Sequence, residues 1–366
     1  MSRIPRICCT PNAMRLPEHT DRSTCASGVE IPAFRLVAEP LRRVRSLVCE
    51  QLNEHLPALA GSEPSAHRRR PEAMDRLIEY VSGRSGKMIR PALLLLAGRC
   101  CGRITDEHVR IAAIIEMIHN ATLLHDDVID EGQKRRGLPT INRLWGNETA
   151  VLLGDLLLSR VFKMCAELEE PQASRVIAAA AVRLCEGELK QAIQKHDWLL
   201  TEPDYIEAIT DKSAVLFRSS CYLGAVLAGA SQEHAQSLAD YGLNAGIAFQ
   251  MTDDLLDIVG DERKTGKTLG SDVDKHKLTL AVMHLLRSVG DEEKETIINS
   301  FLANEGGRHD RNALVKMLSG YGSLDYARNR TQEFVSAAVG ALAGLEESEA
   351  REALVEVAKF MADRAT

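Results

Sequence analysis

Residues 106–132 read DEHVRIAAIIEMIHNATLLHDDVIDEG, an apolar run with an acidic start and a glycine at its end. Acidic residues favour the first turn of a helix, and glycine favours the position just after the last turn. The stretch therefore predicts one long and largely buried helix. Near its end, Asp126, Asp127 and Asp130 form a D-D-x-x-D arrangement that needs a physical explanation.

The same helical pattern continues through the rest of the chain from Phe34 onward. Apolar residues recur at helical spacing, and no alternating pattern typical of strands competes with them. The composition agrees, because 45% of the 366 residues are apolar and only 4% are aromatic. Residues 34–366 therefore predict a single all-α domain of roughly ten or more packed helices. Two segments, 148–168 and 173–195, are apolar on nearly every side, which predicts central helices of the bundle.

Residues 1–33 differ from this pattern, since they mix proline, arginine, cysteine and threonine without helical periodicity. They also lack the apolar core of a secretory signal. The sequence predicts a disordered N-terminal extension, or an upstream start codon with Met14 nearer the true beginning.

Charge and cysteine content exclude several classes of protein. A formal net charge of −7 argues against a basic nucleic-acid surface, and no apolar run reaches the roughly 20 residues that a membrane span needs. The nine cysteines show no C-x-x-C spacing, so we predict small packing residues in a reducing compartment and no structural disulfide. The expected protein is soluble and cytoplasmic.

The D-D-x-x-D arrangement occurs a second time, in FQMTDDLLDIVGDE at residues 249–262, where Asp253, Asp254 and Asp257 repeat it. Residues four apart share one face of a helix, so the first and last aspartates of each motif point the same way. Carboxylates placed together beside apolar residues are costly unless a cation compensates them. Because oxygen ligands favour hard ions, we expect Mg²⁺ before Mn²⁺ or Ca²⁺. A single such motif is more often a solvated acidic face, and the second copy weakens that alternative.

Mg²⁺ usually binds one or two protein carboxylates together with substrate phosphate, so two such clusters suggest a bound polyphosphate. Basic residues beside glycine breaks and helix ends would supply the cations that this polyphosphate needs. They are Lys87, Arg90, Arg135, Arg136, Lys212, Lys267 and Lys277. The GKMIRP and KRRG segments are the more specific candidates, because a guanidinium in a tight loop binds phosphate through two parallel hydrogen bonds. His119 lies two turns before Asp126 on the same face, where a ligand-binding histidine and a buried core histidine are equally good interpretations.

Further motifs occur along the chain in the order SGKMIRP, IHNATLLHDDVIDEGQKRRGLPTIN, GNETAVLLGDLLLSR, DKSAVLF, FQMTDDLLDIVGDERKTGKTLGSDV and GSLDYAR. With these motifs, the chain from about Phe34 to its C-terminus resembles the all-trans polyprenyl diphosphate synthases, most closely the octaprenyl- and decaprenyl-type members. The resemblance implies an all-α bundle around a deep central cavity, the isoprenoid synthase fold, and a homodimer. It also implies Mg²⁺-dependent elongation of an allylic diphosphate by successive head-to-tail condensation with isopentenyl diphosphate.

The same resemblance assigns roles to residues, position by position. Asp126, Asp130 and Asp253 would bind Mg²⁺, about three ions with the diphosphate, with Asp127, Asp254 and Asp257 in support. Isopentenyl diphosphate would be bound by Lys87, Arg90, His119 and Arg136. The allylic diphosphate, which is geranyl, farnesyl or geranylgeranyl diphosphate, would be bound by Arg135, Lys212, Ser213, Gln250, Lys267 and Lys277. Catalysis would depend most on Asp126, Asp130, Asp253, Lys212 and Lys267.

Product length depends on the residues below the first motif. The positions just over one helical turn deeper are Thr122 and Ala121. Short-chain members of the family tend to carry an aromatic side chain there, which closes the bottom of the cavity and forms its floor. Small residues at these positions let the product chain grow past. We therefore expect a product of about C35 to C50, the side chain of a quinone. A floor at Met117, Ile118 or Ile114, further along the helix, leaves a product of about C15 to C20 as the alternative.

Three positions depart from the commonest pattern of the family. Met88 replaces a frequent basic residue, Ser213 a threonine and Ala281 a proline. Ser213 keeps the hydroxyl group, so we expect a small effect there. Met88 removes one charge beside the expected isopentenyl diphosphate site.

Two rival functions are compatible with parts of this pattern. A class I terpene cyclase shares the first motif, but it lacks the GKxxR loop and usually carries a different second metal motif. A non-catalytic subunit of a heteromeric synthase generally loses aspartates or basic positions that this chain keeps. The synthase is therefore the expected function.

Overall fold

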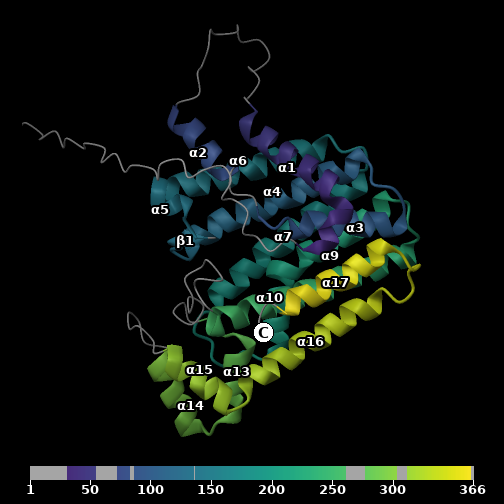
Figure 1. Cartoon of the computed structure of the whole chain (residues 1–366). Coiled ribbons are helices and arrows are strands. Elements are labelled where there is room, and N and C mark those ends of the chain that lie inside the picture. The colour runs from purple at the N-terminus through teal and green to yellow at the C-terminus, as the bar shows by residue number, and fades with distance from the viewer. Residues whose placement is uncertain are drawn as a thin grey trace, which may run out of the picture. The chain divides into compact units, whose positions relative to one another are not determined.

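The computed structural model describes residues 31–54, 72–82, 86–135, 137–260, 277–302 and 311–363. In this part of the chain nearly all regular structure is helical, which confirms the predicted all-α class (Figure 1). Of the predicted N-terminal extension, residues 1–30 lie outside the described ranges, and its disorder stays a prediction. Among the described helices, none combines the length and apolarity that crossing a lipid bilayer requires.

The elements of the first half follow one another with short connections. They are the 3₁₀ helix η1 (Pro32–Val37), α1 (Ala38–Asn53), α2 (Glu72–Ser82), α3 (Ile89–Cys101), α4 (Asp106–Ile129), β1 (Lys134–Arg135), β2 (Leu138–Pro139), α5 (Ile141–Trp145), α6 (Asn147–Ala166) and α7 (Pro171–Ile193).

The second half continues the helical order. Its elements are α8 (Glu202–Ile209), the π-helix η2 (Thr210–Ala214), α9 (Val215–Leu227), α10 (Gln232–Val259), α13 (Leu280–Ser288), α14 (Asp291–Ile297), the π-helix η3 (Ile298–Leu302), α15 (Arg311–Gly320), α16 (Ser323–Ala341) and α17 (Glu349–Asp363). Figure 1 shows α16 and α17 side by side next to α10, and the packing contacts agree.

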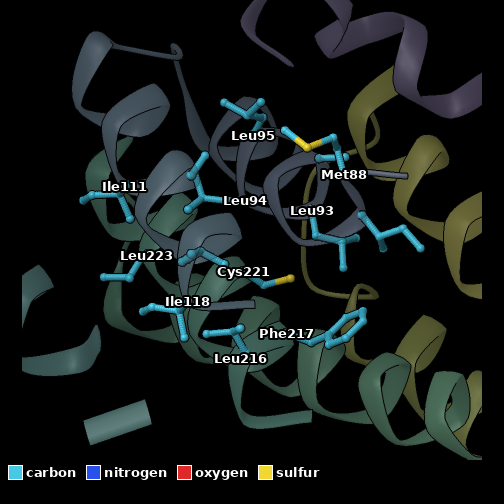
Figure 2. Packing of buried hydrophobic residues seen from close by; sticks show 14 of the residues in the cluster. Met88, Leu93, Leu94, Leu95, Ile111, Ile118, Leu216, Phe217, Cys221 and Leu223 are labelled. Atoms are coloured by element: carbon cyan, nitrogen blue, oxygen red, sulfur yellow. The ribbon is translucent and has the colours of Figure 1, made fainter. Parts of the chain in front are cut away.

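Helix α9 is central to the packing, because it contacts α3, α4, α7 and α10. Figure 2 shows side chains of α3, α4 and α9, among them Leu94, Ile118 and Leu216, filling one hydrophobic core. At the contact of α9 with α3, a Cβ atom on Gly224 would lie 2.0 Å from the carbonyl oxygen of Leu94. Glycine therefore permits an approach of the two helices that any larger residue would prevent.

Helix α4 carries the first aspartate motif and ends at Ile129, earlier than the glycine predicted to end it. Glu131 takes the left-handed backbone conformation, with φ of 50°, and the N–H of Gly132 donates to the Asp127 carbonyl oxygen at 2.8 Å. This pattern is typical of a helix C-terminus. An antiparallel hairpin of β1 and β2 follows. The sequence did not predict this hairpin, because strands of two residues are too short to show periodicity.

The prediction that residues 148–168 and 173–195 form fully central helices is wrong for the single chain. Helices α6 and α7 each leave large apolar side chains exposed, with Phe162 at 71% and Leu189 at 63% of full exposure. The exposed set comprises Val151, Leu152 and Phe162 in α6 and Val182, Leu189 and Ile193 in α7. An apolar pattern shows that a surface avoids water, but it does not say whether the same chain covers that surface.

Candidate active site

The first aspartate motif forms a crowded acidic cluster at the end of α4. Asp126 lies in the last turn, and Asp130 is the C-cap, whose N–H donates to the Asp126 carbonyl oxygen at 2.7 Å. Burial raises the pKa of Asp126 to about 6, with Glu188 and Asp130 raising it further and Lys212 and Arg135 lowering it. These surroundings disfavour the ionised form of Asp126 unless a further cation binds beside it.

This raised pKa predicts an unusual dependence of stability on pH in the absence of divalent ions. The folded protein holds a proton on Asp126 up to about pH 6, whereas the unfolded chain releases it near pH 4. Stability contributed by this group is therefore present at low pH and is lost as pH rises from about 4 to 6. At pH 7.5 in EDTA we expect the free energy of unfolding of Asp126→Asn to exceed that of wild type by roughly 1–3 kcal/mol, so that the variant unfolds at a higher urea concentration.

The difference in free energy of unfolding between Asp126→Asn and wild type should shrink at about pH 3, where Asp126 is largely protonated in both the folded and the unfolded wild type. Asp325→Asn is the control, because the Asp325 side chain is 76% exposed on α16. Urea unfolding at both pH values gives the free energies. An Asp126→Asn variant that is less stable than wild type at pH 7.5 would contradict the effect.

The second aspartate of this motif faces a different partner. Asp127 is buried, and its Oδ1 accepts hydrogen bonds from Arg135 Nε at 2.9 Å and Nη2 at 2.8 Å. Its carbonyl oxygen also accepts from Asn142 Nδ2 at 2.9 Å. These bonds tie the hairpin and α5 to the end of α4. Arg135, predicted to bind the allylic diphosphate, is therefore an ion-pair partner of Asp127 in this structure.

Lys212 lies in the π-helix η2, a type of turn that is frequent at functional sites. Its Nζ donates to Glu188 Oε2 at 2.8 Å and to Gln191 Oε1 at 3.0 Å. Gly187 makes this contact feasible, because a Cβ atom there would lie 2.7 Å from the backbone nitrogen of Lys212. Glu188 and Gln191 were not predicted from the sequence to belong to the site. Their spacing on one helix face directly after a glycine is the signal that was available.

The second aspartate motif lies in the last turns of α10, where Asp254 is only 3% exposed. Its Oδ2 accepts from the Tyr205 hydroxyl at 2.8 Å, and its Oδ1 accepts from Gln250 Nε2 at 2.8 Å and from Lys277 Nζ at 3.3 Å. The Ser213 hydroxyl donates to Gln250 Oε1 at 2.6 Å. The structure thus brings together three predicted residues, Ser213, Gln250 and Lys277. Tyr205, on α8, was not predicted, because nothing in its spacing links it to the motif.

Arg90 connects α3 to the second motif. Burial lowers the pKa of its guanidinium to about 10, while Glu116 and Asp253 raise it. The guanidinium lies over the Phe217 ring, 4.5 Å from its centre, a cation–π contact. Its Nε is buried without a hydrogen-bond partner within the described ranges. A buried, unsatisfied donor on a cation fits the binding of an anionic ligand.

The residues of the neighbouring GKMIRP segment have different surroundings. The Nζ of Lys87 lies 5.6 Å from the centre of the Phe360 ring on α17. Met88 has φ of 54°, and its side chain is buried in the core (Figure 2). This departure from the family pattern therefore contributes apolar packing at that position. His119 is half-buried, and its carbonyl oxygen accepts from the Thr122 hydroxyl at 2.9 Å.

Two cavities adjoin the aspartate motifs. One is lined among others by Asp130, Gln191, Tyr205, Lys212 and Lys277. The other is lined among others by Gly86, Met88, Glu116, Asp127 and Arg135. The first cavity therefore combines the end of one aspartate motif with two predicted phosphate-binding lysines. The second lies against the Asp127 and Arg135 ion pair.

The remaining predicted residues can be placed as follows. Asp257 lies one turn after Asp253 on α10, and both are half-buried. Ala121 is fully buried and Thr122 is half-buried on α4. Arg136 and Lys267 lie outside the described residues.

Within the described ranges, no three acidic, histidine or cysteine side chains converge on one point as a metal cage. Mg²⁺ commonly binds one or two protein carboxylates and completes its coordination with water and substrate phosphate. Asp126, whose ionisation burial disfavours, lies beside the Asp130 carboxylate, and this crowding fits that mode of binding. The residues present are therefore compatible with Mg²⁺ held jointly with a diphosphate.

Comparisons with known proteins agree with these features. A family model described as polyprenyl synthetase matches residues 71–318, more than half of the chain. The octaprenyl diphosphate synthase of Escherichia coli strain K12 is 35% identical over 329 residues, covering 90% of this chain and 97% of that protein. A short chain isoprenyl diphosphate synthase of Methanothermobacter thermautotrophicus is 32% identical over 332 residues, covering 90% of this chain and 98% of that protein.

A solved structure shows the same fold. It is a polyprenyl synthase from Caulobacter crescentus CB15, complexed with calcium and isoprenyl diphosphate, with a TM-score of 0.82 and 32% sequence identity. The match covers 91% of this chain and 97% of that one. These matches confirm the family predicted from the motifs. The chain belongs to the polyprenyl synthetase family and is a trans-prenyltransferase.

Proposed function

We propose that residues 34–366 form a catalytic domain that elongates an allylic diphosphate by repeated head-to-tail condensation with isopentenyl diphosphate. The observation that carries this proposal is the cluster of carboxylates and cations beside an apolar core. In particular, the half-buried Asp126 carboxylate lies within electrostatic reach of Lys212, and Asp253 within reach of Arg90. Such a site can hold a highly charged diphosphate next to an apolar hydrocarbon chain.

The proposed division of roles follows the two substrates. Asp126, Asp130 and Asp253 would hold Mg²⁺, which when bound supplies positive charge that stabilises the diphosphate leaving group. The allylic diphosphate would be held by Arg135, Lys212, Ser213, Gln250, Lys267 and Lys277. Isopentenyl diphosphate would be held by Lys87, Arg90, His119 and Arg136. The unsatisfied Nε of Arg90 supports its role as a diphosphate ligand.

In the proposed reaction the bond between the allylic carbon and the diphosphate oxygen breaks, and both bonding electrons leave with the oxygen. The double bond of isopentenyl diphosphate then attacks the allylic cation, which forms the new carbon–carbon bond. A proton leaves the resulting cation, with the released diphosphate as its acceptor. The role of the protein is to orient both substrates, to stabilise the leaving group and to keep water from the cation.

We propose a long product, about C35 to C50, for a quinone side chain. The small residues Ala121 and Thr122 below the first motif support this length. Relatives of similar identity carry names of both an octaprenyl and a short chain synthase, so about C15 to C20 is the alternative. The cysteines in the described ranges are free thiols, which supports the proposed cytoplasmic location.

The test incubates the purified chain with Mg²⁺, radiolabelled isopentenyl diphosphate and, separately, geranyl, farnesyl and geranylgeranyl diphosphates. The dephosphorylated products are then separated by chain length. A ladder that reaches about C35 or longer is expected. A stop at about C15 or C20 would keep the reaction and overturn the proposed length. No incorporation with any primer would favour a partner-dependent subunit instead.

We also propose that two copies associate through the exposed apolar side chains of α6 and α7. Within α7, Val182, Leu189 and Ile193 recur at spacings typical of one helix face. Val151 and Phe162 lie on the same side of α6, about three turns apart. Large apolar patches of this kind on a monomer mark interaction surfaces. A second copy of the chain is the occupant that the family resemblance implies.

Charge placed on this apolar surface should separate the two copies. Phe162→Glu and Leu189→Glu are each expected to raise the dimer dissociation constant by about a hundredfold or more, because a buried carboxylate would lie without a partner. Light scattering across a dilution series measures the change. Ala343→Glu, at an exposed position beyond α16, should leave the dimer intact. A wild-type chain that is monomeric at micromolar concentration would overturn the proposal.

A further inference from the structure

The hydrogen bonds around Asp254 distinguish it from the other aspartates of its motif. Three donors from three separate segments converge on this one carboxylate, from Tyr205 on α8, Gln250 on α10 and Lys277 before α13. Both carboxylate oxygens accept at least one of these bonds. Asp254 is also almost fully buried, at 3% exposure. Its carboxylate is thus directed into the protein and is already fixed by protein donors.

Asp253 precedes it by one position and therefore points about 100° away around the helix axis. It lies within electrostatic reach of Arg90, on a different side of α10 from the Tyr205 contact. The orientation of Asp253 consequently depends on how the end of α10 is rotated and held. The Asp254 network helps to hold that end of α10, whose length packs against α9 and α16.

In the first motif, too, the first and second aspartates have different surroundings. Asp127, its second aspartate, is buried and pairs with Nε and Nη2 of Arg135, while Asp126 lies in the acidic cluster with Asp130. In each motif the second carboxylate binds a basic residue that follows the motif in sequence. The second motif differs by two further donors, since Asp254 also accepts from the hydroxyl of Tyr205 and from Gln250 Nε2.

We propose that Tyr205 is a positioning residue of the reaction. Its hydroxyl, by donating to Asp254, holds the second aspartate motif and Lys277 in the orientation that accepts the metal-bound diphosphate. Tyr205 is itself 4% exposed and lines the cavity that also contains Asp130, Lys212 and Lys277. This inference rests on the proposed function of that same site.

The expected consequence of losing the hydroxyl follows from the geometry. Without its donor, the buried Oδ2 of Asp254 loses a hydrogen bond that no water replaces easily. The carboxylate then competes more strongly with the diphosphate for Lys277. Residues that orient metal ligands typically change metal affinity or activity by about 10- to 100-fold when they are replaced. Tyr205→Phe should therefore raise the Mg²⁺ concentration for half-maximal activity by about tenfold or more.

Tyr241 provides a matched control on the same helix as the motif. It is fully buried, and its hydroxyl donates to the Leu354 carbonyl oxygen at 2.7 Å, away from the aspartates. Tyr241→Phe removes the same atom and one buried hydrogen bond. Both variants should lose a similar amount of thermal stability. Only Tyr205→Phe should change the Mg²⁺ requirement.

The experiment measures product formation and, by calorimetry, the binding of inorganic diphosphate at increasing Mg²⁺ in wild type and both variants. A tenfold or greater shift in Tyr205→Phe alone is the expected result. Equal Mg²⁺ dependence in the two variants, or no shift in Tyr205→Phe, would overturn the role of Tyr205. Adding Tyr205→Phe to Asp254→Ala should cause little further change, because alanine leaves the Tyr205 hydroxyl no side-chain acceptor at that position. A wild-type protein that binds diphosphate with Mg²⁺ but forms no product would instead refute the proposed function.

Discussion

Asp126→Ala and Asp253→Ala are each expected to lower the rate of chain elongation by about a thousandfold or more. Each replacement removes a carboxylate that we propose as a Mg²⁺ ligand, and the positive charge beside the leaving group is lost with it. The fold should survive. At Asp126 this follows because burial already disfavours the charged form, so alanine removes a carboxylate that the folded chain holds at a cost.

Single-turnover assays at saturating isopentenyl diphosphate separate the chemical step from product release. Circular dichroism and light scattering should show nearly unchanged helical content and oligomer size. Asp325→Ala, on the exposed surface of α16, should keep wild-type turnover. Near-normal activity in Asp126→Ala or Asp253→Ala would show that the assigned metal roles are wrong.

The parts of the site that lie on regular helices were predictable from the sequence. Asp253 and Asp257 share a face of α10 because four residues make just over one helical turn. Ser213, Gln250 and Lys277 are distant in sequence, and family resemblance alone predicted that they belong to one site. The structure joins them around Asp254 through hydrogen bonds.

Other parts depend on tertiary contacts that local patterns do not encode. Tyr205 reaches the second motif only because α8 lies beside the end of α10. Arg135 and Asp127 were assigned to substrate and metal support separately, and the hairpin turns them into a direct ion pair. Likewise, Met88 was read as a missing charge, whereas a left-handed backbone directs its side chain into the core. In each case the missing information was the direction of a side chain.

Thr122→Phe is expected to shorten the product from about C35 or longer to about C15 or C20. Thr122 is half-buried on α4, one turn before Asp126, so an aromatic ring there displaces no fully buried side chain and would narrow the path that we propose for the growing chain. Ala121→Phe should act in the same direction. Because Ala121 is fully buried, however, its ring must also displace neighbours, which costs about 1–3 kcal/mol of stability.

Thr122→Ser is the control, since it keeps the hydroxyl that donates to the His119 carbonyl oxygen and adds no volume. Product length is measured by chromatography after dephosphorylation, with the rate of the first condensation measured separately. A shorter product with an unchanged first condensation would identify a floor, because only later additions need the deeper space. If Thr122→Phe still made the full-length product, the floor would lie elsewhere in the core. Ile118, packed in the core with Leu216 of α9 (Figure 2), would then be the next position to enlarge.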